Sequence, residues 1–137
     1  MTSIQVTGHL RHPAGVVWAL IGDFGGLHHW HPQVRRLDLS WEGRIRTLHY
    51  ADGSRTVERL EARNDPARRY VYSLVGGSLP LQACRTRLQV RPHAAHCVVT
   101  WSSDFEALGD AGQAVEVAMG ATYRAGLDAL AALLGSL

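Results

Sequence analysis

The fold is decided by the last thirty residues of the chain, LGDAGQAVEVAMGATYRAGLDALAALLGSL (residues 108–137). Apolar or small side chains recur in this stretch in steps of three and four, which is the period of an α-helix. They would share one face of that helix: Val115, Met119, Thr122, Tyr123, Gly126, Leu127, Leu130, Leu133 and Leu134. Asp110 is placed to cap the helix or to favour the positive end of its dipole. The stretch therefore predicts one long amphipathic helix.

Small residues crowd the first two thirds of this helix: Gly112, Ala114, Ala118, Gly120, Ala121, Ala125 and Gly126. Each interior Gly weakens a helix by about 1 kcal/mol relative to Ala, so something else must compensate. Either the backbone approaches another element closely, or the small side chains leave a hollow that a ligand fills. The helix alone favours close packing.

Length and composition limit the classes of function. A chain of 137 residues fits a single domain, residues 1–137, and no apolar run approaches the length of a membrane span. The N-terminus resembles no signal peptide, so we expect a cytoplasmic location. Fourteen basic residues, all Arg, are scattered among twelve acidic ones, a pattern that does not indicate nucleic-acid binding. Cys84 and Cys97 lack the spacing of metal ligands.

The rest of the chain alternates apolar and polar residues in seven segments that read as strands. The first strand covers 4–10, and a short helix follows from Pro13 until Gly22, Gly25 and Gly26 break it. A second short helix or loop carries His28-His29-Trp30-His31-Pro32. The remaining strands are expected near 34–39, 44–50, 55–62, 70–75, 81–90 and 97–105. Hairpins join antiparallel strands, so the pattern predicts an α+β fold whose sheet curls around the last helix.

Short motifs along nearly the whole chain carry a resemblance to a known superfamily. They are Val17-Trp18-Ala19-Leu20, Asp23-Phe24, Trp30-His31-Pro32, Gly43 with Arg46, Asp52-Gly53, Glu58-Arg59-Leu60-Glu61, Tyr70 with Tyr72, Gly76-Gly77, Leu79-Pro80-Leu81, and Trp101 with Phe105. In these the chain resembles the START and pollen-allergen (SRPBCC) superfamily, and within it the polyketide cyclase/dehydrase-like branch.

The resemblance implies a helix-grip fold. In that fold a curved antiparallel sheet of seven strands surrounds a long C-terminal helix, with two short helices between strands 1 and 2. It also implies a cavity between sheet and helix, which shifts the balance from close packing to a hollow. Two loops over the cavity mouth would correspond to 51–55 and 76–81. Several relatives have a Tyr where this chain has Cys84, so a polar contact is lost or replaced by a weak thiol.

Glu58 is the first candidate for chemistry, because the family match points its face of the strand into the cavity. A two-residue turn at Asp52-Gly53 would pair Glu58 with Thr47, and a three-residue loop would pair it with Leu48. The resemblance favours the second register, with Arg46, Leu48 and Tyr50 on the face of Glu58. Apolar surroundings would favour the neutral acid, whereas Arg46 would hold it charged, as a base or an orienting group. The alternatives are a solvated Glu on the strand surface or a buried, purely structural ion pair with Arg46.

His31 is the second candidate, since the family match places it at the start of the second strand, near the deep or lateral wall of the cavity. Its imidazole could serve as a base or as a donor to an enolate. The alternative is a surface helix end, which often carries clustered histidines. A metal site of His28, His29 and His31 is a weaker prediction, because no Cys or carboxylate has suitable spacing, and we predict no metal.

The predicted catalytic set is therefore Glu58, His31 and Arg46, without a cofactor. The predicted ligand-binding set is Trp30, Leu48, Tyr50, Leu60, Tyr72, Leu74, Leu81, Cys84, Trp101, Met119 and Tyr123. For each aromatic residue in it, ordinary core packing is the competing interpretation.

Three functions remain open at this stage. The first is a cofactor-independent cyclase, aromatase or dehydratase, and thus in part a lyase, acting on a polyketide-like substrate. The second is a carrier or sensor of a hydrophobic small molecule, and the third is an adaptor for another protein. A homodimer is also left open.

Overall fold

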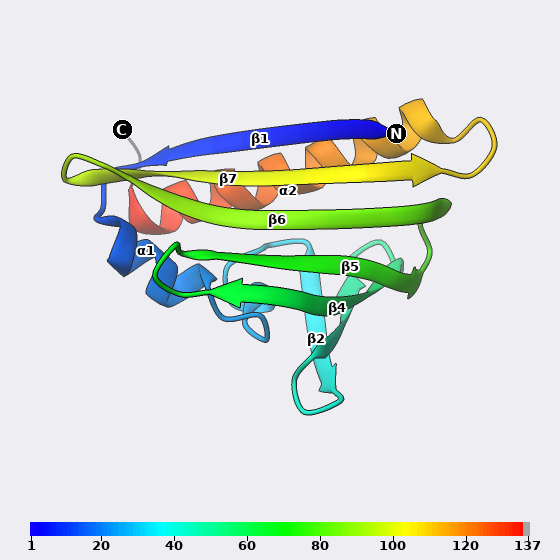
Figure 1. Cartoon of the computed structure of the whole chain (residues 1–137), viewed down its shortest axis with the longest axis horizontal. Helices are drawn as coiled ribbons and strands as arrows, with labels where there is room; N and C mark the ends of the chain where they lie inside the picture. The colour runs from blue at the N-terminus through cyan, green and yellow to red at the C-terminus, as the bar shows by residue number, and fades with distance from the viewer. Residues whose placement is uncertain (136–137) are drawn as a thin grey trace.

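The computed structural model describes residues 1–135 as one seven-stranded antiparallel sheet and one long helix. The elements are β1 (Thr2–Leu10), α1 (Ala14–Ile21), the 3₁₀ helix η1 (Leu27–His29), β2 (Val34–Ser40), β3 (Ile45–Tyr50), β4 (Arg55–Asn64), β5 (Arg69–Gly77), β6 (Leu81–His93), β7 (His96–Ala107) and α2 (Gly112–Leu134). The sheet order is β1-β7-β6-β5-β4-β3-β2 (Figure 1), which confirms the predicted helix-grip fold.

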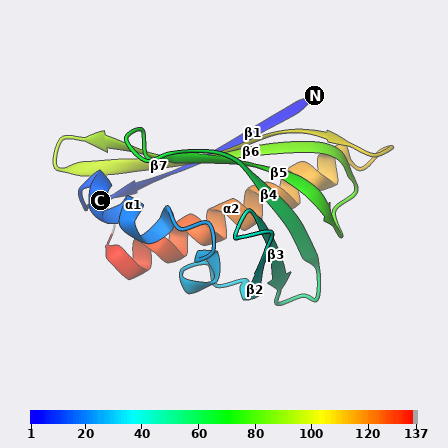
Figure 2. The same ribbon diagram turned by 60° about the horizontal axis from the view of Figure 1, so that its bottom comes forward.

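Helix α2 crosses one face of the sheet, and the β2–β3 end of the sheet bends toward it (Figure 2). Its buried residues repeat at helical period: Val115, Met119, Tyr123, Gly126, Leu127 and Leu130. This confirms most of the predicted stripe, but Leu133 is exposed. The buried stripe and the inner face of the sheet together form the core.

The helix begins four residues later than the sequence suggested. Residues 108–111 form a turn in which Ala111 N donates to Leu108 O at 3.1 Å, and Gly109 has a φ of 53°. Asp110 supplies no side-chain cap, so that expectation is wrong. The helix ends at Leu134, and the last two residues of the predicted helix, 136 and 137, lie outside the described residues.

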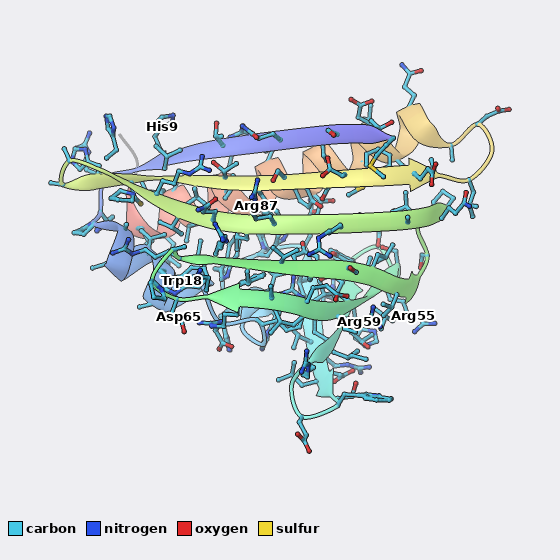
Figure 3. All side chains as sticks on the ribbon, in the orientation of Figure 1. His9, Trp18, Arg55, Arg59, Asp65 and Arg87 are labelled. Atoms are coloured by element: carbon cyan, nitrogen blue, oxygen red, sulfur yellow. The ribbon has the colours of Figure 1, made fainter. Side chains whose placement is uncertain are left out.

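The outer face of the sheet is polar. Arg85 and Arg87 of β6 are exposed, as predicted, and Figure 3 shows Arg87 on the face opposite α2 together with Arg59 of β4.

Trp18 of α1 donates from Nε1 to Asp65 Oδ1 at 3.1 Å, and this bond ties α1 to the β4–β5 turn.

The β3–β4 hairpin corrects the predicted register. Glu58 pairs with Arg46, not with Leu48, and Leu48 pairs with Thr56. The reason is that the three residues 51–53 form the loop, which is closed by a bond from Tyr50 N to Ser54 O of 2.9 Å, with Gly53 at a φ of 88°. The predicted face is nevertheless right, because a shift of two positions preserves the alternation along a strand. The shift places the Arg46 guanidinium directly across from the Glu58 carboxylate.

Candidate functional site

A cavity of about 340 Å³ lies between the sheet and the N-terminal half of α2. Its wall is mostly apolar, and its opening is bordered by the loops at 51–55 and 78–81. It is lined by Gln33, Tyr50, Ala51, Asp52, Ser54, Arg55, Thr56, Glu58, Tyr72, Leu74, Ser78, Leu79, Leu81, Cys84, Thr86, Ala118, Met119, Thr122 and Tyr123. The volume falls in the range of small-molecule pockets.

Strand alternation places the polar groups of this wall. Thr56 and Glu58 project from the inner face of β4, Tyr72 and Leu74 come from β5, and Cys84 and Thr86 come from β6. Glu58 is only 6% exposed although its side chain ends in an ionisable carboxyl group. An unpaired charge at this depth would be strongly unfavourable, so its partner decides its state.

The partner is Arg46, whose Nε donates to Glu58 Oε1 at 2.8 Å. Arg46 is fully buried, and its Nη1 donates to the Phe24 carbonyl oxygen at 2.9 Å. Its guanidinium carbon lies 4.1 Å from the centre of the Phe24 ring and 4.7 Å from that of Tyr72, within the range of cation–π attraction. A guanidinium does not lose its proton in proteins, so Glu58 faces a permanent cation.

Arg46 does not itself line the cavity. Phe24, Tyr70 and Tyr72 pack around it, and the cavity meets only the carboxylate end of the ion pair.

A second set of polar side chains joins wall residues to Ser103, which does not itself line the cavity. Ser103 Oγ is 2.6 Å from Thr86 Oγ1 and 2.6 Å from the Tyr123 hydroxyl, and Cys84 Sγ is 3.7 Å from Thr86 Oγ1. Tyr123 stacks on Trp101 with ring centres 4.4 Å apart. The Trp101 Nε1 donates to the Tyr72 hydroxyl at 3.0 Å. These bonds fix the orientation of Tyr72 and Tyr123.

Burial controls the protonation of these groups. It raises the pKa of Tyr50, Tyr72 and Tyr123, so the three hydroxyls remain protonated donors near neutral pH. Burial also raises the pKa of the Cys84 thiol. Cys84 is therefore a thiol rather than a nucleophilic thiolate.

His31 lies outside the cavity wall, so the expectation that it projects into the cavity is wrong. It is 1% exposed, its Nε2 is 2.8 Å from the Thr122 carbonyl oxygen, and its Nδ1 accepts from Gln33 N at 3.2 Å. Only the neutral ring with its proton on Nε2 satisfies both bonds. Burial likewise lowers the pKa of His31.

The backbone of α2 at Gly126 also lies directly against the His31 ring. A Cβ atom on Gly126 would lie 2.7 Å from His31 Cδ2 and 3.0 Å from Trp101 Cζ3, so only Gly permits this approach. By contrast, a Cβ on Gly120 would meet no atom within 4 Å. Close packing therefore describes Gly126, whereas Ala118 is the small residue of the helix that borders the cavity.

Eight of the predicted site residues line the cavity: Tyr50, Glu58, Tyr72, Leu74, Leu81, Cys84, Met119 and Tyr123. Six do not: Trp30, His31, Arg46, Leu48, Leu60 and Trp101. Trp30, Leu48 and Trp101 are buried in the core, and Leu60 packs against its edge.

Sequence reasoning missed several wall residues. Thr56 and Thr86 alternate in phase with Glu58 and Cys84, and this signal could have identified them. Thr122 lies on the predicted stripe of the last helix and Ala118 among its predicted small residues, whereas no signal marks Gln33. Within residues 1–135 no group of three or more His, Cys, Asp or Glu residues is arranged to hold a metal ion. No helix in the same range has the length and apolarity to cross a bilayer.

Comparison with known proteins agrees with this architecture. Residues 1–135 match the family model described as polyketide cyclase/dehydrase and lipid transport. The structure of the protein XoxI from Bacillus cereus shares 29% identity with this chain, covers 98% of it and 96% of its own length, and superposes with a TM-score of 0.94. A Thermobifida fusca protein shares 32% identity over 98% of this chain and 94% of its own, with a TM-score of 0.86.

A more distant structure supports the fold alone. The Zhui aromatase/cyclase from Streptomyces sp. R1128 shares 17% identity over 93% of this chain and 90% of its own, with a TM-score of 0.76. No curated protein sequence matches the chain. The family match over nearly all residues, together with the helix-grip architecture, shows that the chain belongs to the polyketide cyclase/dehydrase and lipid transport family of the SRPBCC superfamily.

Proposed function

We propose that this protein binds a hydrophobic small molecule in the cavity between the sheet and α2, as a carrier or sensor, and that the ligand contacts Glu58. One observation carries the proposal: a carboxylate 6% exposed stands on the wall of a mostly apolar cavity. Packing alone does not need it there, since a buried ion pair is often no more stabilising than apolar side chains of similar volume. A polar contact with a ligand gives the carboxylate a use.

The cavity volume limits the ligand. At the packing density of a protein interior, about 340 Å³ would hold roughly 250 Å³ of ligand atoms. A planar compound with two or three rings fits this estimate. The stacked pair of Tyr123 and Trp101 provides a rigid aromatic surface beside it.

Catalysis is the second candidate, favoured by the position of Glu58 among protonated tyrosines. In a cyclisation, Glu58 would take a proton from a carbon between two carbonyl groups, and a hydroxyl of Tyr50 or Tyr123 would donate to the enolate oxygen. The enolate carbon would then bond to a second carbonyl carbon, whose C=O π bond breaks to give an alkoxide, and the alkoxide would take the proton back from Glu58. In a dehydration, the proton held by Glu58 would leave with the departing hydroxyl as water. Arg46 would act as a positioning residue, and no cofactor would be needed.

We rank the carrier first because only one of the three expected acid–base groups reaches the cavity. His31 has both nitrogens engaged, and Arg46 is enclosed behind Glu58. A carrier needs Glu58 only for orientation.

Native mass spectrometry of protein purified from its own host tests the binding step. We expect a small molecule to be retained by the wild type and lost from an Ala118→Phe variant, whose ring would extend from α2 into the cavity mouth. Exposed Ala114 on the same helix provides the control, Ala114→Phe, which should retain the molecule. A wild-type protein that emerges empty at native concentration would contradict the proposal.

The same preparation distinguishes the two candidates. A retained compound that is chemically unaltered after prolonged incubation, and that raises the thermal stability of the protein, supports a carrier. Conversion of a poly-carbonyl compound that is abolished in a folded Glu58→Gln variant supports the cyclase or dehydratase.

A further inference from the structure

The charges around the cavity are distributed unequally. Three charged residues line it: Asp52 and Arg55 are exposed at the mouth, whereas Glu58 is buried in the wall. The two nearby groups that could supply positive charge, Arg46 and His31, are both outside the wall. Among the described residues, the buried part of the wall therefore presents one carboxylate and no cation.

An unused hydroxyl accompanies this carboxylate. Thr56 lies two positions before Glu58 on the same face of β4 and is 5% exposed. Its Oγ1 is buried and has no hydrogen-bond partner among the described residues, although it is near enough to the Tyr50 hydroxyl to influence the pKa of Tyr50. An unpaired buried hydroxyl is unfavourable, and a ligand that bonds to it removes that cost.

Thr56, Glu58 and Tyr50 thus form a polar cluster with a definite preference. Glu58 can only accept hydrogen bonds, because its charge is held by Arg46. Thr56 and Tyr50 can donate or accept. A ligand hydroxyl satisfies this cluster completely, since it can donate to Glu58 while accepting from a neighbouring hydroxyl. A ligand carboxylate would have no proton for Glu58 and would place like charges together.

We infer that this cavity selects a neutral ligand that presents a hydroxyl group to Glu58 and Thr56, and that it rejects carboxylates of the same shape. The inference rests on the proposed binding function and adds the chemical class of the ligand.

The pKa values of side chains in the wall indicate how a bound anion would be received. The pKa of Tyr50, Tyr72, Cys84 and Tyr123 is raised, first by burial and further by the negative charge of Glu58. Each raised pKa means that a negative charge on that side chain is disfavoured. A bound carboxylate would meet the same loss of water and the same repulsion.

Three biphenyl compounds of nearly equal size test the inference at pH 7.5 by isothermal titration calorimetry. They are 4-phenylphenol, which is neutral and carries a donor, 4-methoxybiphenyl, which is neutral without a donor, and biphenyl-4-carboxylate. We expect the phenol to bind wild-type protein at least about tenfold more tightly than either other compound, because a hydrogen bond to a charged group is worth that ratio or more.

Two variants assign the preference to the cluster. In the double variant Arg46→Met/Glu58→Leu both charges are removed together, so that neither is left buried alone. We expect the advantage of the phenol over the carboxylate to fall to within about threefold in that protein. Thr56→Val should weaken the phenol, because the ligand oxygen loses a hydroxyl that can donate to it. Glu61→Gln is the matched control, because Glu61 is also on β4 but pairs with Arg59 away from the cavity, and its preference should equal that of the wild type.

The outcomes separate the inference from the function on which it rests. If the carboxylate binds wild-type protein as tightly as the phenol, or if the double variant keeps the full preference, the inference is overturned while binding in the cavity stands. If none of the three compounds binds wild-type protein, the proposed function is itself contradicted.

Discussion

Two glycines of α2 give opposite predictions for the same substitution. Gly126 and Gly120 both lie inside the helix, so each Gly→Ala change should gain about 1 kcal/mol of helix stability. At Gly126 the added methyl group would lie 2.7 Å from His31 Cδ2 and 3.0 Å from Trp101 Cζ3. At Gly120 it would meet no atom within 4 Å.

The collision at Gly126 cannot be relieved cheaply. His31 is bonded through both ring nitrogens, and Trp101 is stacked on Tyr123 and bonded to Tyr72. Overpacking a well-ordered core costs about 1–3 kcal/mol. After the gain in helix propensity, we expect Gly126→Ala to lower the free energy of unfolding by up to about 2 kcal/mol. Gly120→Ala should raise it by about 1 kcal/mol.

Urea unfolding followed by circular dichroism measures both effects. The midpoints should move in opposite directions while the m-value stays constant, because neither change alters the surface exposed on unfolding. In thermal melts the expected separation is on the order of 5–10 °C for a domain of this size. The reasoning is refuted if Gly126→Ala stabilises the protein as much as Gly120→Ala does, since the helix would then not approach His31 and Trp101 as closely as described.

Two further predictions concern the buried charges. Arg46→Met should destabilise the protein by about 3–5 kcal/mol because it leaves Glu58 buried without a partner, whereas Arg46→Met/Glu58→Leu should recover most of that loss. Urea titrations of both variants measure the difference in the free energy of unfolding. Equal stability of the two variants would contradict the prediction. The lowered pKa of His31 means that the unfolded chain binds its proton more readily, so the contribution of His31 is complete above about pH 6.5 and is lost as the pH falls below it. Unfolding free energies from pH 5 to 8 should therefore fall less steeply toward acid in His31→Gln than in wild type, and parallel profiles would argue against a buried neutral imidazole.

The sequence predicted the cavity wall best where strands supply it. Alternation along β4, β5 and β6 leaves only two directions for a side chain, so Glu58, Tyr72 and Cys84 could be assigned to the inner face before their neighbours were known. The error in the β3–β4 register did no harm to these assignments, because it moved the pairing by two residues.

The misplaced residues lie where periodicity stops or where depth matters. His31 follows a 3₁₀ helix and precedes β2, so no repeat specifies the direction of its ring. Trp101 lies on the inner face of the sheet, as predicted, but it is stacked behind Tyr123. The alternation along a strand shows which face a side chain is on and not which side chain covers another. Arg46 is screened in the same way by Phe24 and Tyr72.

The contrast between Gly126 and the cavity-lining part of α2 also explains how the helix can pack closely and enclose a cavity at once. Around Gly126 the helix backbone lies against His31 and Trp101 without space for a methyl group, and this contact fixes its separation from the sheet. One to two turns earlier, Thr122, Met119 and Ala118 border the cavity. His31 joins the two regions, because its Nε2 bonds to the carbonyl of Thr122. We infer that His31 holds the helix at the distance that the cavity requires, and that it thereby contributes to binding without contacting the ligand.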